Sequence, residues 1–386
     1  MLENQLLHDI SIKKDYVNQI NKNNEYNEKV ILEYYSRMKH EYSTDYFYNS
    51  IFLSDEEKER NKHINTILRK TNFDNKISNI SSCNSLWKFD KYEVQKVKDF
   101  LGTNLCRDKF CNNCKKVKQA NRMVRFIPYI DKFKDDYSLH HLTLTVPNCS
   151  GTDLHKVIKN IFSSFKSLNR YFNLDLKIRG LDFGQYGYAG SLRSLEITFK
   201  GDNYHPHLHC IFALDKNFNQ KKHNINTYSY SYNNLSRLFS DLEVLIQKIW
   251  YLLINGNRVT KKAIDNLEEG YSCSMDSIDD SSYYEVFKYM TKSTDEKNEV
   301  LTYDNFKTLY FSLYRVRQIQ GYGIFYNIKD DDSITDKVDE LYDVIISILQ
   351  AKEKPVEILE SPQDVAKDNQ YTYISRKRIF SYLKNL

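Results

Sequence analysis

The sequence is poor in glycine and proline and has no long apolar run. Its 386 residues include 11 Gly and 5 Pro, whereas Tyr, Asn, Lys and Ile are abundant. This bias is typical of an AT-rich genome rather than of one fold. No stretch of about 18 apolar residues occurs, which excludes an ordinary transmembrane helix.

Two sequence signals are also missing. The N-terminus lacks the basic region followed by an apolar run that marks a signal peptide. The phosphate-binding pattern GxxxxGK[ST] is absent, so the sequence gives no sign, by this motif, of an ATP-driven motor within the chain. We therefore expect a cytoplasmic protein without a membrane partner. In that compartment, its seven cysteines point to metal binding or reduced thiols rather than disulfides.

Charge is distributed unevenly along a chain long enough for about two domains of ~150 residues. The net charge is only +5. Residues 88–134, however, carry thirteen Lys or Arg against five Asp or Glu, and residues 329–343 carry seven acids against two lysines. The basic block suits a phosphate backbone, and the acidic segment suits self-shielding or a protein partner.

A β-hairpin is predicted at residues 193–213, where apolar and β-branched residues flank a turn at 201–203. Side chains alternate between the two faces of a strand, so His207 and His209 project to one face. Glu196 lies on the preceding strand. If the two strands pair across the turn, one carboxylate and two imidazoles converge.

Two imidazoles and one carboxylate, with open positions left, suit a catalytic divalent metal. Oxygen-rich coordination favours Mg or Mn, and the histidine pair would also accept Zn. The alternative is a chance histidine cluster at a strand end, where Pro206 interrupts the ladder. The acid on the matching strand favours the metal site, in which His205 could replace one ligand or support the others.

A second metal site is predicted from cysteine spacing. Cys111 and Cys114 are separated by two residues and can hold one edge of a tetrahedral zinc ion. Cys83 and Cys106 are the natural remaining ligands. Three reduced cysteines in a loop are the simpler alternative, because only one Cys-x-x-Cys pair is present.

A basic helix is predicted directly after this cysteine segment. A solvated surface helix would have the same composition, but a zinc knuckle that leads into a basic helix favours nucleic acid. The candidate DNA-binding residues are Lys115, Lys116, Lys118, Arg122 and Arg125.

A third group of chemically useful residues lies near residue 289. In a helix, Glu285 and Tyr289 are one turn apart on the same face, and Lys292 follows one turn later. A phenolate can attack phosphorus, a nearby ammonium lowers the pKa of the phenol, and a carboxylate can accept a proton. An ordinary exposed helix is the alternative in a chain with 31 tyrosines, and Tyr283 and Tyr284 are rival nucleophiles.

The remaining pattern predicts an α+β fold. A strand is expected at 140–146, and helices at 27–40, 55–70, 153–172, 234–253 and 304–320. We expect a central antiparallel sheet flanked by helices. Four segments are predicted, namely a helical N-terminal region at 1–75, a cysteine-rich and basic zinc-knuckle module at 76–135, a domain at 136–325 that contains this sheet, and an acidic helical tail at 326–386.

These features in order resemble the rolling-circle replication initiators (Rep proteins) of small Gram-positive plasmids, within the HUH endonuclease superfamily. The resemblance runs from about Cys83 to Gly321. It rests on the cysteine cluster, on the strand Leu142-Thr-Leu-Thr-Val-Pro147, on His-Pro-His-Leu-His at 205–209, and on Glu285-x-x-Lys-Tyr289-x-x-Lys292. The family pattern often has proline between the last two cysteines, where this chain has Asn112-Asn113.

The resemblance implies an HUH-like fold and a specific set of roles. His207 and His209 would be metal ligands, Glu196 the acidic third ligand, Tyr289 the nucleophile, and Glu285 the group that activates water at termination. The implied activity is metal-dependent nicking and strand transfer on single-stranded plasmid origin DNA through a 5′-phosphotyrosine. The 3′-OH would prime a host polymerase, and a separate host helicase would unwind the template. The alternatives are an HUH transposase or mobilisation relaxase, a non-catalytic zinc-dependent repressor, and a hydrolase of small phosphoesters.

Overall fold

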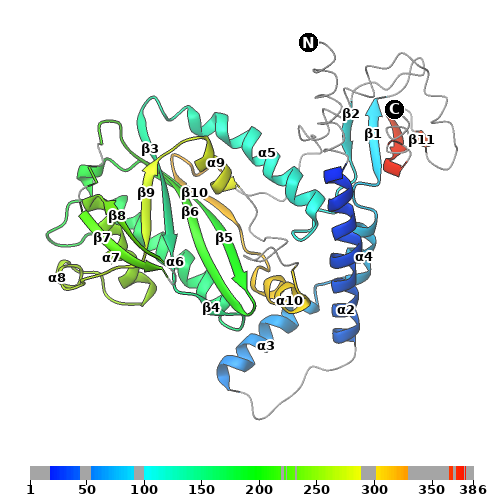
Figure 1. Cartoon of the computed structure of the whole chain (residues 1–386), viewed down its shortest axis with the longest axis horizontal. Coiled ribbons are helices and arrows are strands. Elements are labelled where there is room, and N and C mark those ends of the chain that lie inside the picture. The colour runs from blue at the N-terminus through cyan, green and yellow to red at the C-terminus, as the bar shows by residue number, and fades with distance from the viewer. Residues whose placement is uncertain are drawn as a thin grey trace. The chain divides into compact units, whose positions relative to one another are not determined.

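The computed structural model describes residues 18–43, 54–90, 100–218, 221–222, 224–230, 233–287, 301–328, 365–367, 371–377 and 379 (Figure 1). The chain divides into two compact units, one from residues 1–121 and 332–386 and the other from residues 122–331. The predicted α+β class, with antiparallel sheets flanked by helices, is confirmed. Within the first unit, side chains of the N-terminal helices contact the cysteine segment.

The unit of residues 122–331 is built on a six-stranded antiparallel sheet with the order β10-β5-β6-β3-β9, in which β4 pairs with β6. The strands are β3 (Tyr137–Thr145), β4 (Cys149–Ser150), β5 (Gly190–Lys200), β6 (Asn203–Asp215), β9 (Cys273–Ser277) and β10 (Ile319–Gly323). β5 and β6 form the predicted hairpin, and Gly201 at its turn has a positive φ of 58°. Because β6 is central, its side chains are held by strands on both sides.

Three helices form a layer on one face of this sheet. They are α6 (Leu154–Phe172), α7 (Asp241–Ile254) and α10 (Tyr303–Ser312), of which α7 and α10 both contact α6. Phe165 and Phe172 of α6, the helix predicted at 153–172, contact Phe212 of β6. Since strand residues alternate, the odd-numbered residues of β6 around His209 face the other side.

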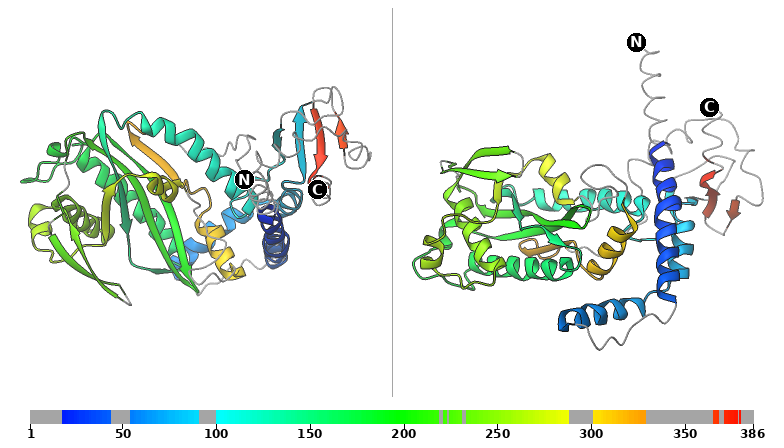
Figure 2. Two further views of the ribbon diagram at one scale, coloured as in Figure 1. Left: turned by 45° about the horizontal axis from the view of Figure 1, so that its top comes forward. Right: turned by 60° about the horizontal axis from the view of Figure 1, so that its bottom comes forward.

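The opposite face is divided into an apolar end and a polar end. Helix α9 (Asp280–Phe287) and the later part of α5 (Asn112–Asp131) pack on the apolar end, around a core that includes Leu192 of β5 and Ile211 of β6 (Figure 2). Along the same strands and the same face, Glu196 and His209 replace apolar residues. Hydrophobic packing therefore anchors α9 beside a cluster of polar side chains.

Two predicted helices have different bounds in the structure. The helix predicted at 234–253 begins at Asp241, because Ser240 and Glu243 form a capping box and residues before it belong to β8 (Asn233–Phe239). The helix predicted at 304–320 is only Tyr303–Ser312. Thr302 caps it, and the chain then enters β10 after Arg315 at a positive φ of 55°. β8 pairs with β7 (Asn224–Tyr230). The described part of this unit also contains two short elements, α8 (Lys261–Asp265) and η2 (Gly184–Tyr186).

The other unit combines helices with a second sheet. Its helical elements are η1 (Asn27–Ile31), α2 (Leu32–Ser43), α3 (Asp55–Leu68) and α4 (Phe73–Ser81). Its antiparallel sheet has the order β11-β12-β1-β2, formed by β1 (Leu86–Asp90), β2 (Phe100–Thr103), β11 (Val365–Lys367) and β12 (Tyr371–Ser375). The helices predicted at 27–40 and 55–70 are confirmed, and Ser54 caps the second through a capping box with Glu57.

The prediction of a helical C-terminal tail is wrong for residues 371–375. They form β12, which pairs along the whole of β1 from Leu86 to Asp90. The alternating segment Tyr-Thr-Tyr-Ile-Ser has the β-branched and aromatic composition that suits a strand. The acidic segment at 329–343 lies outside the described residues. Within the described ranges, no helix has the length and apolar character needed to cross a membrane.

Candidate functional site

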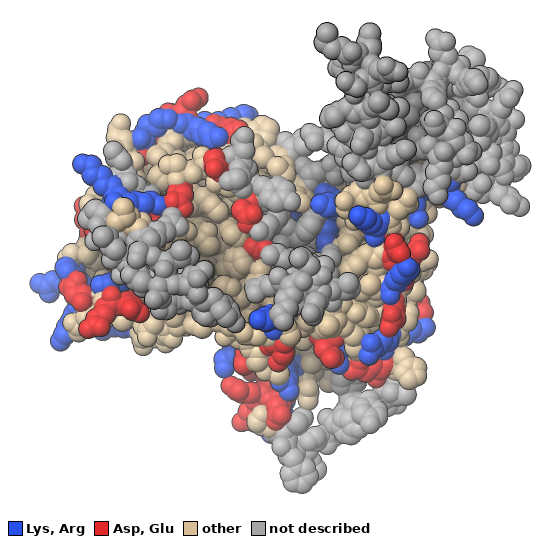
Figure 3. Space-filling view, in the orientation of Figure 1, with Lys and Arg blue, Asp and Glu red and all other residues tan. Residues whose placement is uncertain are grey.

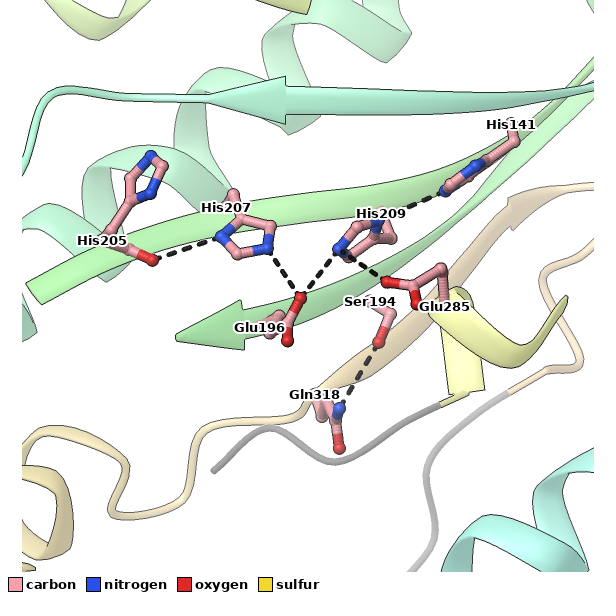
Figure 4. A network of polar contacts seen from close by, with 8 residues as sticks. All are labelled: His141, Ser194, Glu196, His205, His207, His209, Glu285 and Gln318. Atoms are coloured by element: carbon pink, nitrogen blue, oxygen red, sulfur yellow. Dashed lines mark hydrogen bonds and ion pairs between the residues drawn. The ribbon is translucent and has the colours of Figure 1, made fainter. Parts of the chain in front are cut away.

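The polar end of the sheet brings the three predicted metal ligands together (Figure 4). The hairpin register places Glu196 directly opposite His207 and Ser194 opposite His209. One carboxylate oxygen of Glu196 lies 2.7 Å from Nε2 of His207 and 2.9 Å from Nε2 of His209. The pairing of the strands across the turn thus produces the predicted convergence.

Burial and donor chemistry make this cluster suitable for a divalent cation. Glu196 is only 3% exposed, and an isolated buried carboxylate is costly unless it is paired or coordinates a metal. The three ligand atoms of Glu196, His207 and His209 all lie within 4.8 Å of one another. Two nitrogens and one oxygen, on strands that hold them rigidly, fit a catalytic metal with open positions.

The other ring nitrogen of each histidine also has a partner. Nδ1 of His207 lies 3.2 Å from the backbone oxygen of His205, and Nδ1 of His209 lies 3.2 Å from Nε2 of His141. These contacts direct both Nε2 atoms toward Glu196, which is how outer partners orient metal-binding imidazoles. His205 therefore supports the cluster through its backbone.

Glu285 approaches the cluster from α9. Its Oε2 atom lies 3.9 Å from Nε2 of His209, and its side chain is 38% exposed. A carboxylate in this position is close to both the ligand atoms and solvent. Tyr289 and Lys292 lie outside the described residues.

The rival nucleophile Tyr283 belongs to the core. Its side chain is 1% exposed and its hydroxyl donates to Asp131 at 2.6 Å. It packs with Val286 and Phe287 on the apolar end of the sheet. The phenol of Tyr283 is therefore withdrawn from any substrate. The side chain of Tyr284 lies outside the described residues.

The four predicted cysteine ligands form a second cluster. Sγ of Cys83 lies 3.5 Å from Sγ of Cys111 and 3.7 Å from Sγ of Cys114, and Cys106 lies 3.5 Å from Cys114. Backbone N–H groups donate to two of the sulfurs, from Cys106 to Cys83 at 3.4 Å and from Arg107 to Cys114 at 3.2 Å. Hydrogen bonds from neighbouring thiols, first that of Cys106, lower the pKa of Cys83. Four sulfurs with N–H donors around them fit a tetrahedral metal.

Asn112, which lies between Cys111 and Cys114, ties this cluster to the N-terminal helices. Asn112 is the first residue of α5, and its N–H donates to the side chain of Asn27 at 2.9 Å. Asn27 in turn donates to Sγ of Cys111 at 3.2 Å. Tyr35 of α2 donates to Asp108, which also forms an ion pair with Lys76. The turn is therefore stabilised by side chains from elements distant in sequence.

Comparison with known proteins decides the family. The family model described as "Replication protein" matches residues 97–369 of this chain. The chain belongs to this replication protein family. The finding confirms the predicted membership of the Rep family and the coarser functional prediction, a plasmid replication initiator.

Several curated relatives of this replication protein are named "Protein rep". One from Staphylococcus aureus is 26% identical over 202 residues, which is 50% of this chain and 83% of the relative. One from Bacillus amyloliquefaciens is 24% identical over 188 residues, which is 47% of this chain and 50% of the relative. One from a Bacillus species is 25% identical over 207 residues, which is 51% of this chain and 61% of the relative. The chain thus spans half the length of one of these two Bacillus relatives and about three fifths of the other. No solved structure matches it significantly.

The predicted DNA-binding residues of this Rep protein differ in how far their side chains are buried. Lys115 is 5% exposed and Arg122 is 6% exposed, so both are buried, and the prediction of a DNA contact is wrong for these two. Lys116 and Lys118 are half-buried, and the side chain of Arg125 lies outside the described residues. On the face drawn in Figure 3, the described Lys and Arg side chains are interspersed with Asp and Glu.

Two features of the site were not predicted from the sequence. Arg122 donates to Gln318 at 2.8 Å, and Gln318 lies 3.5 Å from Ser194, which precedes Glu196 by two residues on the same strand face (Figure 4). His141 contacts His209 and has no role in the sequence-based prediction, although strand alternation places it on the site face. Burial lowers the pKa of His141 to about 4, so its imidazole is neutral at pH 7.

Proposed function

We propose that this Rep protein is a metal-dependent, site-specific endonuclease and strand transferase that nicks single-stranded origin DNA. The observation that carries the proposal is the buried Glu196–His207–His209 cluster with Glu285 beside it, in a chain of the replication protein family. Two imidazoles and a carboxylate would hold Mg²⁺ or Mn²⁺. When bound, the cation supplies positive charge that stabilises the developing charge on a non-bridging phosphate oxygen.

The covalent step in this proposal belongs to Tyr289. Its phenolate oxygen forms a bond to phosphorus while the bond to the 3′ oxygen breaks, which leaves a 5′-phosphotyrosine and a 3′ alkoxide. The alkoxide takes a proton from water and becomes the free 3′-OH. Lys292 would stabilise the phenolate, and Glu285 would take a proton from the phenol or, at termination, from water. One phosphodiester replaces another, so strand transfer needs no ATP. The 3′-OH would serve a host polymerase, and a host helicase would open the duplex.

Labelled single-stranded origin oligonucleotides test this activity. With Mn²⁺ or Mg²⁺, we expect a covalent protein–DNA complex that survives denaturing gel electrophoresis. When a chelator is added before the DNA, this complex should not form. A non-catalytic repressor would retain the oligonucleotide on a native gel but give no covalent complex. Transposon ends or a mobilisation origin, tested as substrates in parallel, would identify a transposase or relaxase.

We propose zinc as the metal of the Cys83, Cys106, Cys111 and Cys114 cluster, where it would hold the N-terminal helices and the start of α5 together. Replacing Cys111 and Cys114 by serine is expected to reduce thiolate-bound zinc from about one ion per chain to none. Release by a mercurial reagent with a colorimetric zinc indicator measures this ion. Cys149→Ser is the control, because Cys149 lies outside the cluster. Equal zinc release from wild type and the double variant would disprove the assignment.

We propose that Lys116 and Lys118 contact the DNA backbone, whereas buried Lys115 stabilises the cysteine segment. Each lost phosphate contact on a single strand should reduce the slope of log binding constant against log salt by about 0.7, so Lys116→Ala with Lys118→Ala should reduce it by about 1.4. Fluorescence anisotropy at several salt concentrations measures the slope. Lys115→Met should leave the slope unchanged. A slope that changes with Lys115→Met instead would contradict this division of roles.

A further inference from the structure

We propose that His141 is a positioning residue for the metal ligand His209, whose ring it holds so that Nε2 faces Glu196. The inference rests on the proposed metal centre and deepens it. It assigns a role to a side chain on a third strand, outside the hairpin that carries the ligands.

The chemistry of imidazole sets the direction of the hydrogen bond. A neutral imidazole that uses Nε2 as a metal ligand carries its proton on Nδ1, so Nδ1 must donate. For His207 the partner is the backbone oxygen of His205, which can only accept. For His209 the partner is Nε2 of His141 at 3.2 Å. His141 therefore accepts through Nε2 and carries its own proton on Nδ1.

The strand geometry holds His141 in place. Thr143 of β3 pairs directly with His209. His141, two residues earlier on β3, is therefore the diagonal neighbour of His209 on the same face of the sheet. β3 is paired on both sides, with His141 opposite Ile211 of β6 and Asp276 of β9. The rings of His141 and His209 are nearly parallel, at 19° with centroids 5.4 Å apart. A partner on a doubly paired strand has little freedom to move away.

A substitution can remove the outer hydrogen-bond partner of His209 but not that of His207. The outer partner of His207 is backbone and survives substitution of His205, whereas that of His209 is a side chain. Outer partners of metal-binding histidines typically contribute about 10- to 100-fold in metal affinity. We expect His141→Phe, which keeps a ring but has no acceptor, to raise the Kd for Mn²⁺ by this factor.

Calorimetric titration of zinc-loaded protein with Mn²⁺ tests the inference with three variants. His141→Gln restores an acceptor oxygen and should recover most of the affinity lost in His141→Phe. His140→Phe is the matched control, because His140 is a buried neighbour whose Nε2 contacts Ser138. It should bind Mn²⁺ as wild type does. Thermal unfolding without Mn²⁺ shows whether any variant has lost its fold.

The titrations distinguish failure of the positioning role of His141 from failure of the proposed metal centre. Wild-type affinity in His141→Phe, or equal losses in His141→Phe and His141→Gln, would overturn the positioning role and leave the metal centre intact. A wild-type protein that binds no Mn²⁺ would overturn the proposed centre and the inference with it. Loss in His141→Phe with recovery in His141→Gln supports the role, because a purely structural effect would not follow the acceptor.

Discussion

Replacing Tyr289 by phenylalanine is expected to abolish the covalent protein–DNA complex and to reduce origin cleavage by about 10³-fold or more. The change removes one oxygen atom, the proposed nucleophile, and leaves the aromatic ring. Metal binding at Glu196, His207 and His209 should be unaffected, because these ligands lie on the β5–β6 hairpin. The complex is measured by denaturing gel electrophoresis with an oligonucleotide labelled on the 3′ side of the cleavage site.

Tyr284→Phe is the matched control for this experiment. Tyr284 is a neighbouring tyrosine of α9, and its substitution should preserve both complex formation and cleavage. Tyr283→Phe is a poor control, because loss of its hydrogen bond to Asp131 would disturb the core that anchors α9. A covalent complex that persists in Tyr289→Phe and is lost in Tyr284→Phe would transfer the nucleophile to residue 284.

Replacing His207 and His209 together by alanine is expected to reduce cleavage to background, by at least about 10³-fold, because two of three ligand atoms disappear. The remaining ligand, Glu196, would be left as a single buried carboxyl group without either imidazole. Excess Mn²⁺ should therefore not restore activity. Cleavage rates across a Mn²⁺ series measure the loss, and circular dichroism monitors the fold.

His155→Ala is the control for removing an imidazole elsewhere. His155 lies on α6, on the opposite side of the sheet, where it contacts the backbone oxygen of Ser312. It should cleave at the wild-type rate. Metal-dependent cleavage that survives in the double histidine variant would place the catalytic cation elsewhere and remove the main support for the proposed function.

Local sequence pattern predicted the site where its residues are close along the chain. Alternation assigned His207 and His209 to one face, and the short turn at 201–203 allowed Glu196 to be matched with them. The spacing of Cys111 and Cys114 likewise predicted a cluster that the structure brings together. These predictions succeeded because a strand repeats every two residues and because a tight turn determines the register of a hairpin.

Predictions failed where the bounds of a helix or strand, or the burial of a charged side chain, depended on contacts with residues distant in sequence. The apolar residues before Ser240 continue a helical pattern, yet they pair with β7, and the capping box begins the helix later. Residues 371–375 become a strand because β1, almost 300 residues earlier, offers an edge. Lys115 and Arg122 resemble surface cations in sequence, but tertiary packing buries both.

The sequence by itself determined the hairpin that carries Glu196, His207 and His209, the cysteine cluster and the α+β class, because each depends on periodicity or spacing over a few tens of residues. Only the tertiary structure decided that His141 supports His209, that Glu285 approaches the same cluster, and that Tyr283 is withdrawn into the core. These relations join β3, β6 and α9, and no local periodicity specifies which side chains of separate elements meet when a sheet and its helices pack together.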